Sequence, residues 1–241
     1  MTGLFLNLQQ LESLFYLVLK KNFCMNFTET PITILLIAIN VIFSVIGLSN
    51  ADMMNKTIGW PYYTKRENQY YRFITSGFLH GDWMHLFFNM FTLYFFGRNI
   101  ELLFTEYGLG GNIAYLVLYF LALVVADIPS YIKNQDNIAY RSLGASGAVS
   151  AVVFAAIVFS PWSSIYLYGA LKISAAVYAV LYIVYCVYMG KQQNDNVNHD
   201  AHLWGSLFGL AFTLALIGLM QPILFDGIIE QLKQPSLFGR P

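Results

Sequence analysis

Six apolar segments, most of them long enough to cross a membrane, dominate this sequence and constrain what it can fold into. A hydrocarbon core about 30 Å thick is crossed by about 20 helical residues. Backbone groups in lipid must bond to one another, and the segments lack the alternating pattern of barrel strands, so we expect helices. The sequence predicts an all-α, polytopic membrane protein with six transmembrane helices, at Pro31–Leu48, Met84–Phe104, Gly110–Ile128, Ala145–Phe159, Ile173–Met189 and Ala201–Met220.

The composition favours a single membrane domain. Hydrophobic residues make up 57% and charged residues 11% of the 241 residues, against about 25% charged residues in a soluble domain. The formal net charge is zero, and without a long charged run nucleic acid is not an expected partner. We expect the membrane domain at residues 30–221 and a short C-terminal tail at 222–241. Cys24 and Cys186 lie far apart in the sequence, and we expect both to be free thiols.

Residues 1–29 allow more than one interpretation. Apolar residues at helical spacing favour an amphipathic helix on the membrane surface, with its stripe at Leu4, Leu8, Leu11, Phe15 and Val18. Two lysines follow this apolar run instead of preceding it, which argues against a cleaved signal peptide. Alternatively, these residues are an upstream extension and translation starts at Met25.

The long first connection, at residues 49–82, is rich in aromatic side chains. Amphipathic rings favour the headgroup layer, so we expect this segment to lie along the membrane interface, anchored by Trp60, Tyr62, Tyr63, Tyr70 and Tyr71. Lysine and arginine residues divide almost evenly between the two sides of the predicted topology, so the positive-inside rule does not set its orientation.

The sequence GASG at residues 144–147 contains a candidate nucleophile, Ser146. The segment Ala145–Phe159 spans about 22 Å as a helix, which would put Ser146 roughly 8 Å below the membrane surface. The polar sequence KNQDNIAYRS precedes it and is suited to lining a water-filled entrance. Gly144 relaxes the turn into the helix, and Gly147 permits another backbone to approach the serine closely.

The last apolar segment offers a general base, His202. Gly205 and Gly209 form a GxxxG pair just after it, and a stripe of alanines after Ser146 suits close packing against this pair. Such packing would bring His202 towards Ser146, and imidazole has the pKa range needed to accept the serine proton. Asp200 is turned about 200° away on the helix, so we expect a dyad without a carboxylate.

Two further polar residues, His85 and Asn89, lie four positions apart and therefore on one face of the second helix. Both can donate hydrogen bonds, which is what an oxyanion requires. The alternative is that they only bond neighbouring helices together.

Other enzyme classes fit less well. The chain has no HExxH motif for a metalloprotease. His199 and His202 could ligate a metal, but we expect His199 to be solvated in its polar loop. Asp127 is the one carboxylate available to an aspartyl protease, and a transporter that uses His85 and Asn89 has no visible inverted repeat to support it. We expect neither a cofactor nor a metal.

Taken in order, these motifs resemble those of the rhomboid intramembrane serine proteases. The shared residues are Tyr71 and Arg72, His80, His85, Asn89, Glu101, GASG and AHLWGSLFG from Ala201. The resemblance implies a six-helix rhomboid-like bundle in which Ser146 is the nucleophile, His202 is the base, and His85, Asn89 and the Ser146 amide form an oxyanion hole. It also implies a cytoplasmic amino terminus, an extracytoplasmic active site, substrate entry between the second and fifth helices, and a cap at residues 190–198.

Two positions depart from the family pattern. Ser150 stands where an aromatic residue often stacks on the catalytic histidine, and Tyr71 stands in place of a tryptophan. The first departure leaves open how the His202 ring is held. We assign Arg72 and Glu101 to structural roles.

The sequence therefore predicts an intramembrane serine endopeptidase. It would hydrolyse peptide bonds in or near transmembrane segments of other membrane proteins, so its partners would be those substrates and membrane lipid. The alternative is a catalytically silent rhomboid-like protein that binds transmembrane segments, against which the intact Ser146 and His202 argue. We expect a multi-pass protein of the bacterial inner (plasma) membrane.

Overall fold

A computed structural model describes residues 29–167, 171–192, 195 and 197–239 as a bundle of long helices. The amphipathic helix predicted for residues 1–29 lies almost wholly outside the described residues. The helices and strands, in chain order, are α2 (Pro31–Ser49), α3 (Ala51–Thr57), α4 (Pro61–Arg66), α5 (Arg72–Thr75), η1 (Ser76–Phe78), α6 (Trp83–Thr92), η2 (Leu93–Gly97), α7 (Arg98–Glu106), α8 (Gly111–Asn134), α9 (Ser146–Phe159), β1 (Ser164–Leu167), β2 (Leu171–Ser174), α10 (Ala175–Gln192), α11 (His199–Met220) and α12 (Leu224–Leu232).

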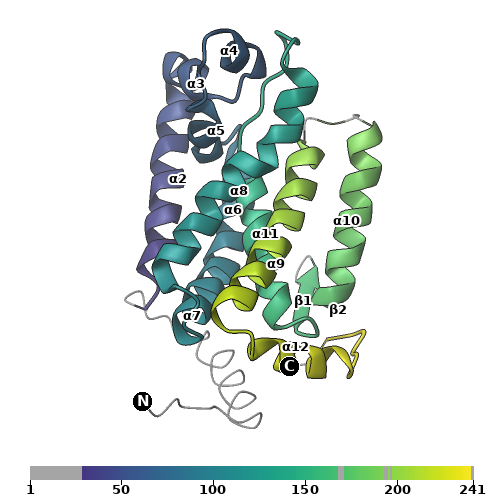
Figure 1. The fold of residues 1–241 in the computed structure, drawn as a ribbon. Helices are drawn as coiled ribbons and strands as arrows, with labels where there is room; N and C mark the ends of the chain where they lie inside the picture. The colour runs from purple at the N-terminus through teal and green to yellow at the C-terminus, as the bar shows by residue number, and fades with distance from the viewer. Residues whose placement is uncertain (1–28, 168–170, 193–194, 196, 240–241) are drawn as a thin grey trace.

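The long helices run side by side, with α3, α4 and α5 at one end of the bundle and the hairpin and α12 at the other (Figure 1). Four helices are long and apolar enough to cross a membrane, namely α2, α8, α10 and α11. The chain is thus an integral membrane protein. The second predicted segment is one continuous helical run of α6, η2 and α7 that contains a π-helical turn, and α9 has only 14 residues. The count of six spans therefore stays a prediction.

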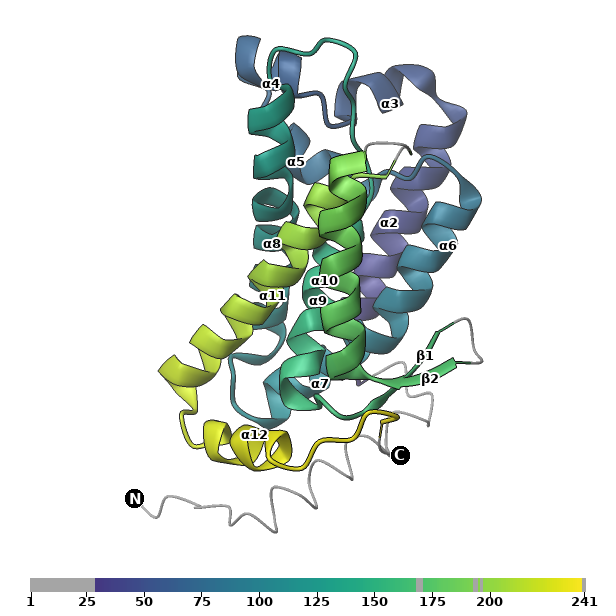
Figure 2. The same ribbon diagram turned by 90° about the vertical axis from the view of Figure 1, so that its right-hand side faces the viewer.

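Helix α9 lies at the centre of the bundle. All of its residues from Gly147 to Phe159 are buried, and it packs against α6, η2, α7, α8, α10 and α11. Alanine and valine dominate this helix, and its small residues permit close approach of a neighbouring helix, as at Gly147 and Ala151 against α11. Helix α10 is the opposite case, since only Ala175 and Cys186 are buried among its residues. It lies at the edge of the bundle in Figure 1 and at the front in Figure 2.

The all-α prediction was wrong over one short stretch. Strands β1 and β2 form an antiparallel hairpin in which Ser164 pairs with Ser174 and Ile165 with Ile173. Ile173 had been predicted to begin the fifth helix, but that helix begins at Ala175. The run of apolar residues did not distinguish a short strand from the first turn of a helix, because both bury apolar side chains.

Glu101 and Arg72, to which we assign structural roles, both bond to backbone groups of neighbouring segments. The buried carboxylate of Glu101 accepts hydrogen bonds from the backbone N–H groups of Ile32 and Thr33, each at 2.8 Å, and so satisfies the first turn of α2. Arg72 donates from Nη1 to the carbonyl oxygens of Asn55 and Ile58 at 3.0 and 2.6 Å. Burial lowers the pKa of this guanidinium from its ordinary value.

The first connection also braces the segment that leads into α9. Gly59 and Ser142 exchange two backbone hydrogen bonds of 2.9 Å. The Arg141 guanidinium lies 3.9 Å from the centroid of the Trp60 ring. These contacts hold Arg141 and Ser142, which lead into GASG, against the part of the first connection that contains the short helices α3, α4 and α5. That this connection lies along the membrane interface stays a prediction.

Candidate active site

The GASG turn places Ser146 at the first position of α9. Gly144 has φ 119°, a conformation that favours glycine, and its N–H donates to the carbonyl oxygen of Ser76 at 3.0 Å. A Cβ on Gly144 would lie 2.9 Å from Nε2 of His85 and 3.8 Å from Oγ of Ser146. The glycine therefore makes room for the His85 ring beside the serine. The amides in the first turn of a helix have no partner within that helix, so they are available to a ligand.

His85 and Asn89 come from α6. Asp82 caps this helix, its carboxylate accepting the His85 N–H at 2.8 Å. The His85 ring packs edge-on against His80, with the ring centroids 4.9 Å apart. Asn89 donates one N–H to the carbonyl oxygen of His85 at 3.0 Å, and its amide has a second N–H for a ligand.

His80 is a buried support for this face of the site. Its Nδ1 lies 2.8 Å from Oγ of Ser44, which itself donates to the carbonyl oxygen of Phe78. Burial, and then the charge of the neighbouring His85, lower the pKa of His80 to about 3. His80 is therefore neutral at physiological pH and holds α2 and the His85 ring in place.

His202 is brought to the site by close packing of α11 on α9. A Cβ on Gly205 would clash with the backbone carbonyl of Gly147, and one on Gly209 with that of Ala151. Only glycine permits this approach, as the GxxxG pattern predicted. The contact fixes the register of α11 so that His202, one turn before Gly205, faces the start of α9.

An aromatic residue does hold the His202 ring, but it comes from another helix. Tyr182 of α10 stacks on His202 with the ring centroids 6.2 Å apart and the planes at 22°. The hydroxyl of Tyr182 lies 3.0 Å from Oγ of Ser150 and makes a hydrogen bond with it. Ser150 therefore does not stack on His202 itself, but its hydrogen bond helps to position the Tyr182 ring that does.

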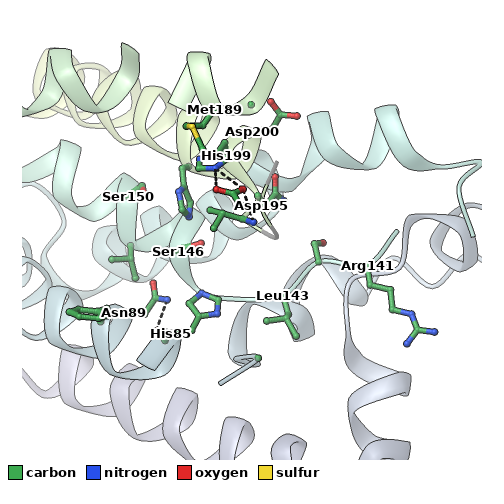
Figure 3. Close-up of a pocket in the computed structure, with 18 of the residues that line it drawn as sticks. His85, Asn89, Arg141, Leu143, Ser146, Ser150, Met189, Asp195, His199 and Asp200 are labelled. Atoms are coloured by element: carbon green, nitrogen blue, oxygen red, sulfur yellow. Dashed lines mark hydrogen bonds and ion pairs between the residues drawn. The ribbon is translucent and has the colours of Figure 1, made fainter. Parts of the chain in front are cut away.

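Ser146, His202, His85 and Asn89 all line one cavity of about 1050 Å³. In Figure 3, His85 and Asn89 approach Ser146 from one side, and His199 and Asp195 lie on the other. The polar segment before α9 contributes to the lining, as the sequence predicted, through Lys133, Asn134, Asn137, Ala139, Tyr140, Arg141 and Ser142. The structure thus brings the four predicted site residues together, beside polar side chains that can hold water.

The acidic residues near the site are engaged elsewhere. A carboxylate oxygen of Asp200 lies 3.5 Å from Nζ of Lys133. Asp127 accepts a hydrogen bond of 3.3 Å from the Asn198 amide, and Asn198 caps α11. Neither carboxylate bonds to His202 among the contacts of the described residues.

One prediction at this site was wrong. His199 is not a solvated loop residue, since it begins α11 and its side chain is only 3% exposed. Sequence reasoning also assigned no role to Tyr182 or Cys186 of α10. Their spacing of four along the helix was the available signal, because it puts both on one face.

The chain is similar to known proteins. The family model of the Rhomboid domain matches residues 67–219. Two proteins of Arabidopsis thaliana are similar to the chain. RHOMBOID-like protein 12, mitochondrial, is 30% identical over 146 residues, which are 55% of this chain and 42% of that protein. Rhomboid-like protein 11, chloroplastic, is 30% identical over 156 residues, which are 61% of this chain and 52% of that protein.

The chain thus spans about half the length of these curated relatives. The names of the relatives refer to a mitochondrion and a chloroplast, so they lend no support to the bacterial inner membrane predicted from the sequence.

Proposed function

Because this chain belongs to the rhomboid family, we propose that it is an intramembrane serine endopeptidase with Ser146 and His202 as a catalytic dyad. The observation that carries the proposal is the shared cavity. A serine, a histidine and two hydrogen-bond donors from three different helices line one cavity inside the bundle. Polar side chains inside a membrane bundle are costly and mark function.

The chemistry follows from these groups. His202 takes the hydroxyl proton of Ser146 as Oγ attacks the carbonyl carbon of the scissile peptide bond. The negative charge that develops on the carbonyl oxygen is stabilised by N–H donors of His85, Asn89 and the Ser146 backbone. The C–N bond breaks as His202 gives its proton to the leaving amine. Water from the cavity, with His202 again as base, then hydrolyses the acyl ester and restores the serine.

His202 has no carboxylate to orient it in the proposed dyad, so we propose that packing contacts orient its ring instead. In a triad the carboxylate orients the imidazole. Here the stack of Tyr182 on His202, and the hydrogen bond between the hydroxyl groups of Tyr182 and Ser150, restrict the movement of the His202 ring.

The substrates we propose are transmembrane segments of other proteins. Phe88, Asn89 and Thr92 of α6 line one side of the cavity, while Tyr178, Tyr182 and Met189 of α10 line another. Helix α10 is the most exposed of the long helices that line the cavity, and its displacement by a substrate would break the contacts of Tyr182 with α9 and α11. A substrate helix entering between α6 and α10 must unwind to present its scissile carbonyl, which favours helix-breaking residues in the substrate.

The topology that accompanies this function has six spans and a cytoplasmic amino terminus, with the GASG end of α9 towards the extracytoplasmic side. A bacterial inner membrane remains our prediction for the location. The proposed cap at residues 190–198 falls partly outside the described residues.

The test is cleavage of a model transmembrane substrate in detergent. Ser146→Ala and His202→Ala should each lower the rate on the order of 10³-fold or more. His85→Ala and Asn89→Ala should each cost on the order of 10²-fold, as single oxyanion donors. Ser49→Ala is the matched control, since Ser49 is exposed and bonds only to carbonyl groups of its own helix.

Labelling by a fluorophosphonate separates the two candidate functions. The protease should be labelled at Ser146, and Ser146→Ala should abolish the label. A silent protein that binds transmembrane segments would retain the substrate without cleaving it. Full cleavage by Ser146→Ala would rule out the serine mechanism.

A further inference from the structure

Three side chains of metal-binding type meet between α10 and α11, behind the base of the proposed dyad. Cys186, His199 and His202 each offer one ligand atom, and these atoms lie within 4.8 Å of one another. Cys186 is only 1% exposed and His199 only 3%. Cys186 is a free cysteine, and its thiol contacts the hydroxyl of Tyr182, a contact that a metal bound to the sulfur would replace.

His199 supplies an independent indication that a ligand belongs here. Its Nε2 lies 3.1 Å from both carboxylate oxygens of Asp195. A carboxylate only accepts hydrogen bonds, so Nε2 carries a proton; when the ring carries no second proton, Nδ1 has a bare lone pair that can bind a metal. That Nδ1 is buried without a hydrogen-bond partner among the described residues. A buried polar atom left unpaired is costly and uncommon in native structures.

We propose that Cys186, His199 and His202 form a binding site for a thiophilic divalent cation, with Zn²⁺ as the reference ion. Thiolate and imidazole are the ligands that zinc prefers, and three protein ligands leave a fourth tetrahedral position for water. Ligand atoms around one zinc lie about 3.5 Å apart at ordinary Zn–N and Zn–S distances. A side-chain adjustment of about 1 Å brings the three atoms to that spacing.

The surroundings suit this role. Asp195 stands behind His199 as the carboxylate that orients a metal-binding imidazole in many zinc sites and fixes its tautomer. His199, His202 and Asp195 all line the polar cavity, which gives a hydrated ion a path to the site (Figure 3).

A cation here would inhibit the protease, a consequence that rests on the proposed function. Metal on the nitrogen that faces Ser146 occupies the lone pair that must accept the serine proton. Metal on the other nitrogen leaves the ring proton on the nitrogen that faces the serine, so the ring cannot act as a base there either. Zinc binding and general-base catalysis therefore exclude each other at His202.

The binding test does not depend on activity. Calorimetric titration of the full chain in detergent with Zn²⁺ should show one site, and Co²⁺ should give the thiolate-to-metal absorption band. Cys186→Ser and His199→Gln should each lose the Co²⁺ band and weaken Zn²⁺ binding at least ~10-fold, and Asp195→Asn should weaken it about 10- to 100-fold. Cys24→Ser removes the other cysteine and should keep the affinity. Equal affinity in wild type and Cys186→Ser would overturn the site.

The activity test compares each variant with its own metal-free rate. Zn²⁺ should inhibit the wild type reversibly, a chelator should restore it, and the inhibition midpoint should rise at least ~10-fold in Cys186→Ser. Binding without any protease activity would support the metal site and overturn the proposed function. Full activity at saturating Zn²⁺ would overturn the inhibitory role.

Discussion

The stack of Tyr182 on His202 gives the sharpest prediction about how this site works. Replacing Tyr182 with alanine removes the ring that lies 6.2 Å from the imidazole at an interplanar angle of 22°. Aromatic pairs of this kind contribute about 0.5–1.5 kcal/mol beyond their buried area. If that energy holds the base in its reactive position, kcat should fall about 2- to 12-fold, because 1.36 kcal/mol corresponds to a factor of ten.

Tyr182→Phe separates the ring from the hydroxyl. It keeps the stack and loses the hydroxyl, with its 3.0 Å hydrogen bond to Ser150 and its contact with the Cys186 thiol. The ring remains confined between α9 and α11, so we expect at least about half of the wild-type kcat. The free energy of unfolding should fall by about 1–2 kcal/mol, and the melting temperature should fall with it. Ser150→Ala removes the 3.0 Å bond from the other side and keeps the contact with Cys186, so it should lower the stability no more than Tyr182→Phe does.

The assay combines steady-state cleavage with the rate at which a fluorophosphonate labels Ser146. Labelling needs the base but no transmembrane substrate, so both rates should fall together in Tyr182→Ala if the ring positions His202. Tyr188→Ala is the control on the same helix, with an exposed side chain. The reasoning is refuted if Tyr182→Ala labels at the wild-type rate, or if Tyr182→Phe loses as much as Tyr182→Ala.

Three further predictions concern the scaffold. Glu101→Gln should lower the free energy of unfolding by about 2–3 kcal/mol, since a buried charged acceptor for the start of α2 is lost; an unchanged melting temperature in detergent would contradict this. Gly209→Ala should lower the free energy of unfolding by about 1–3 kcal/mol, because the added Cβ meets the Ala151 backbone. Gly218→Ala is the control on the same helix: its Cβ meets only the Phe225 ring, so the substitution should be neutral or stabilising. Burial lowers the pKa of His80 to about 3, so the folded protein binds fewer protons at this residue than the unfolded chain. The free energy of unfolding should therefore be retained above pH 6.5 and fall as the pH drops towards 3. At pH 5 the loss should be about 2 kcal/mol. Melting curves should show this slope in wild type and a smaller one in His80→Asn.

The sequence predicted a mostly helical membrane protein, and the four residues that it proposed for the site line one cavity, because both inferences depend on local rules. Lipid requires long apolar helices, and a buried serine or histidine among them is conspicuous. The small residues around Ser146 and Gly205 even indicated which helix faces would meet, since close approach demands glycine or alanine at both partners. The hairpin at β1 and β2 was missed because an apolar run of a few residues does not distinguish a strand from a helix start.

What only the tertiary structure decided lies between α10 and α11. The rotation of α10 about its axis determines that Tyr182 rather than Ser150 stacks on His202, and that Cys186 meets His199. Helix α10 presents apolar and aromatic residues on all sides, so its sequence has no polar face from which that rotation could be inferred. Local hydrophobicity determined where the helices lie along the chain, and the packing of one side chain against another determined what surrounds the base.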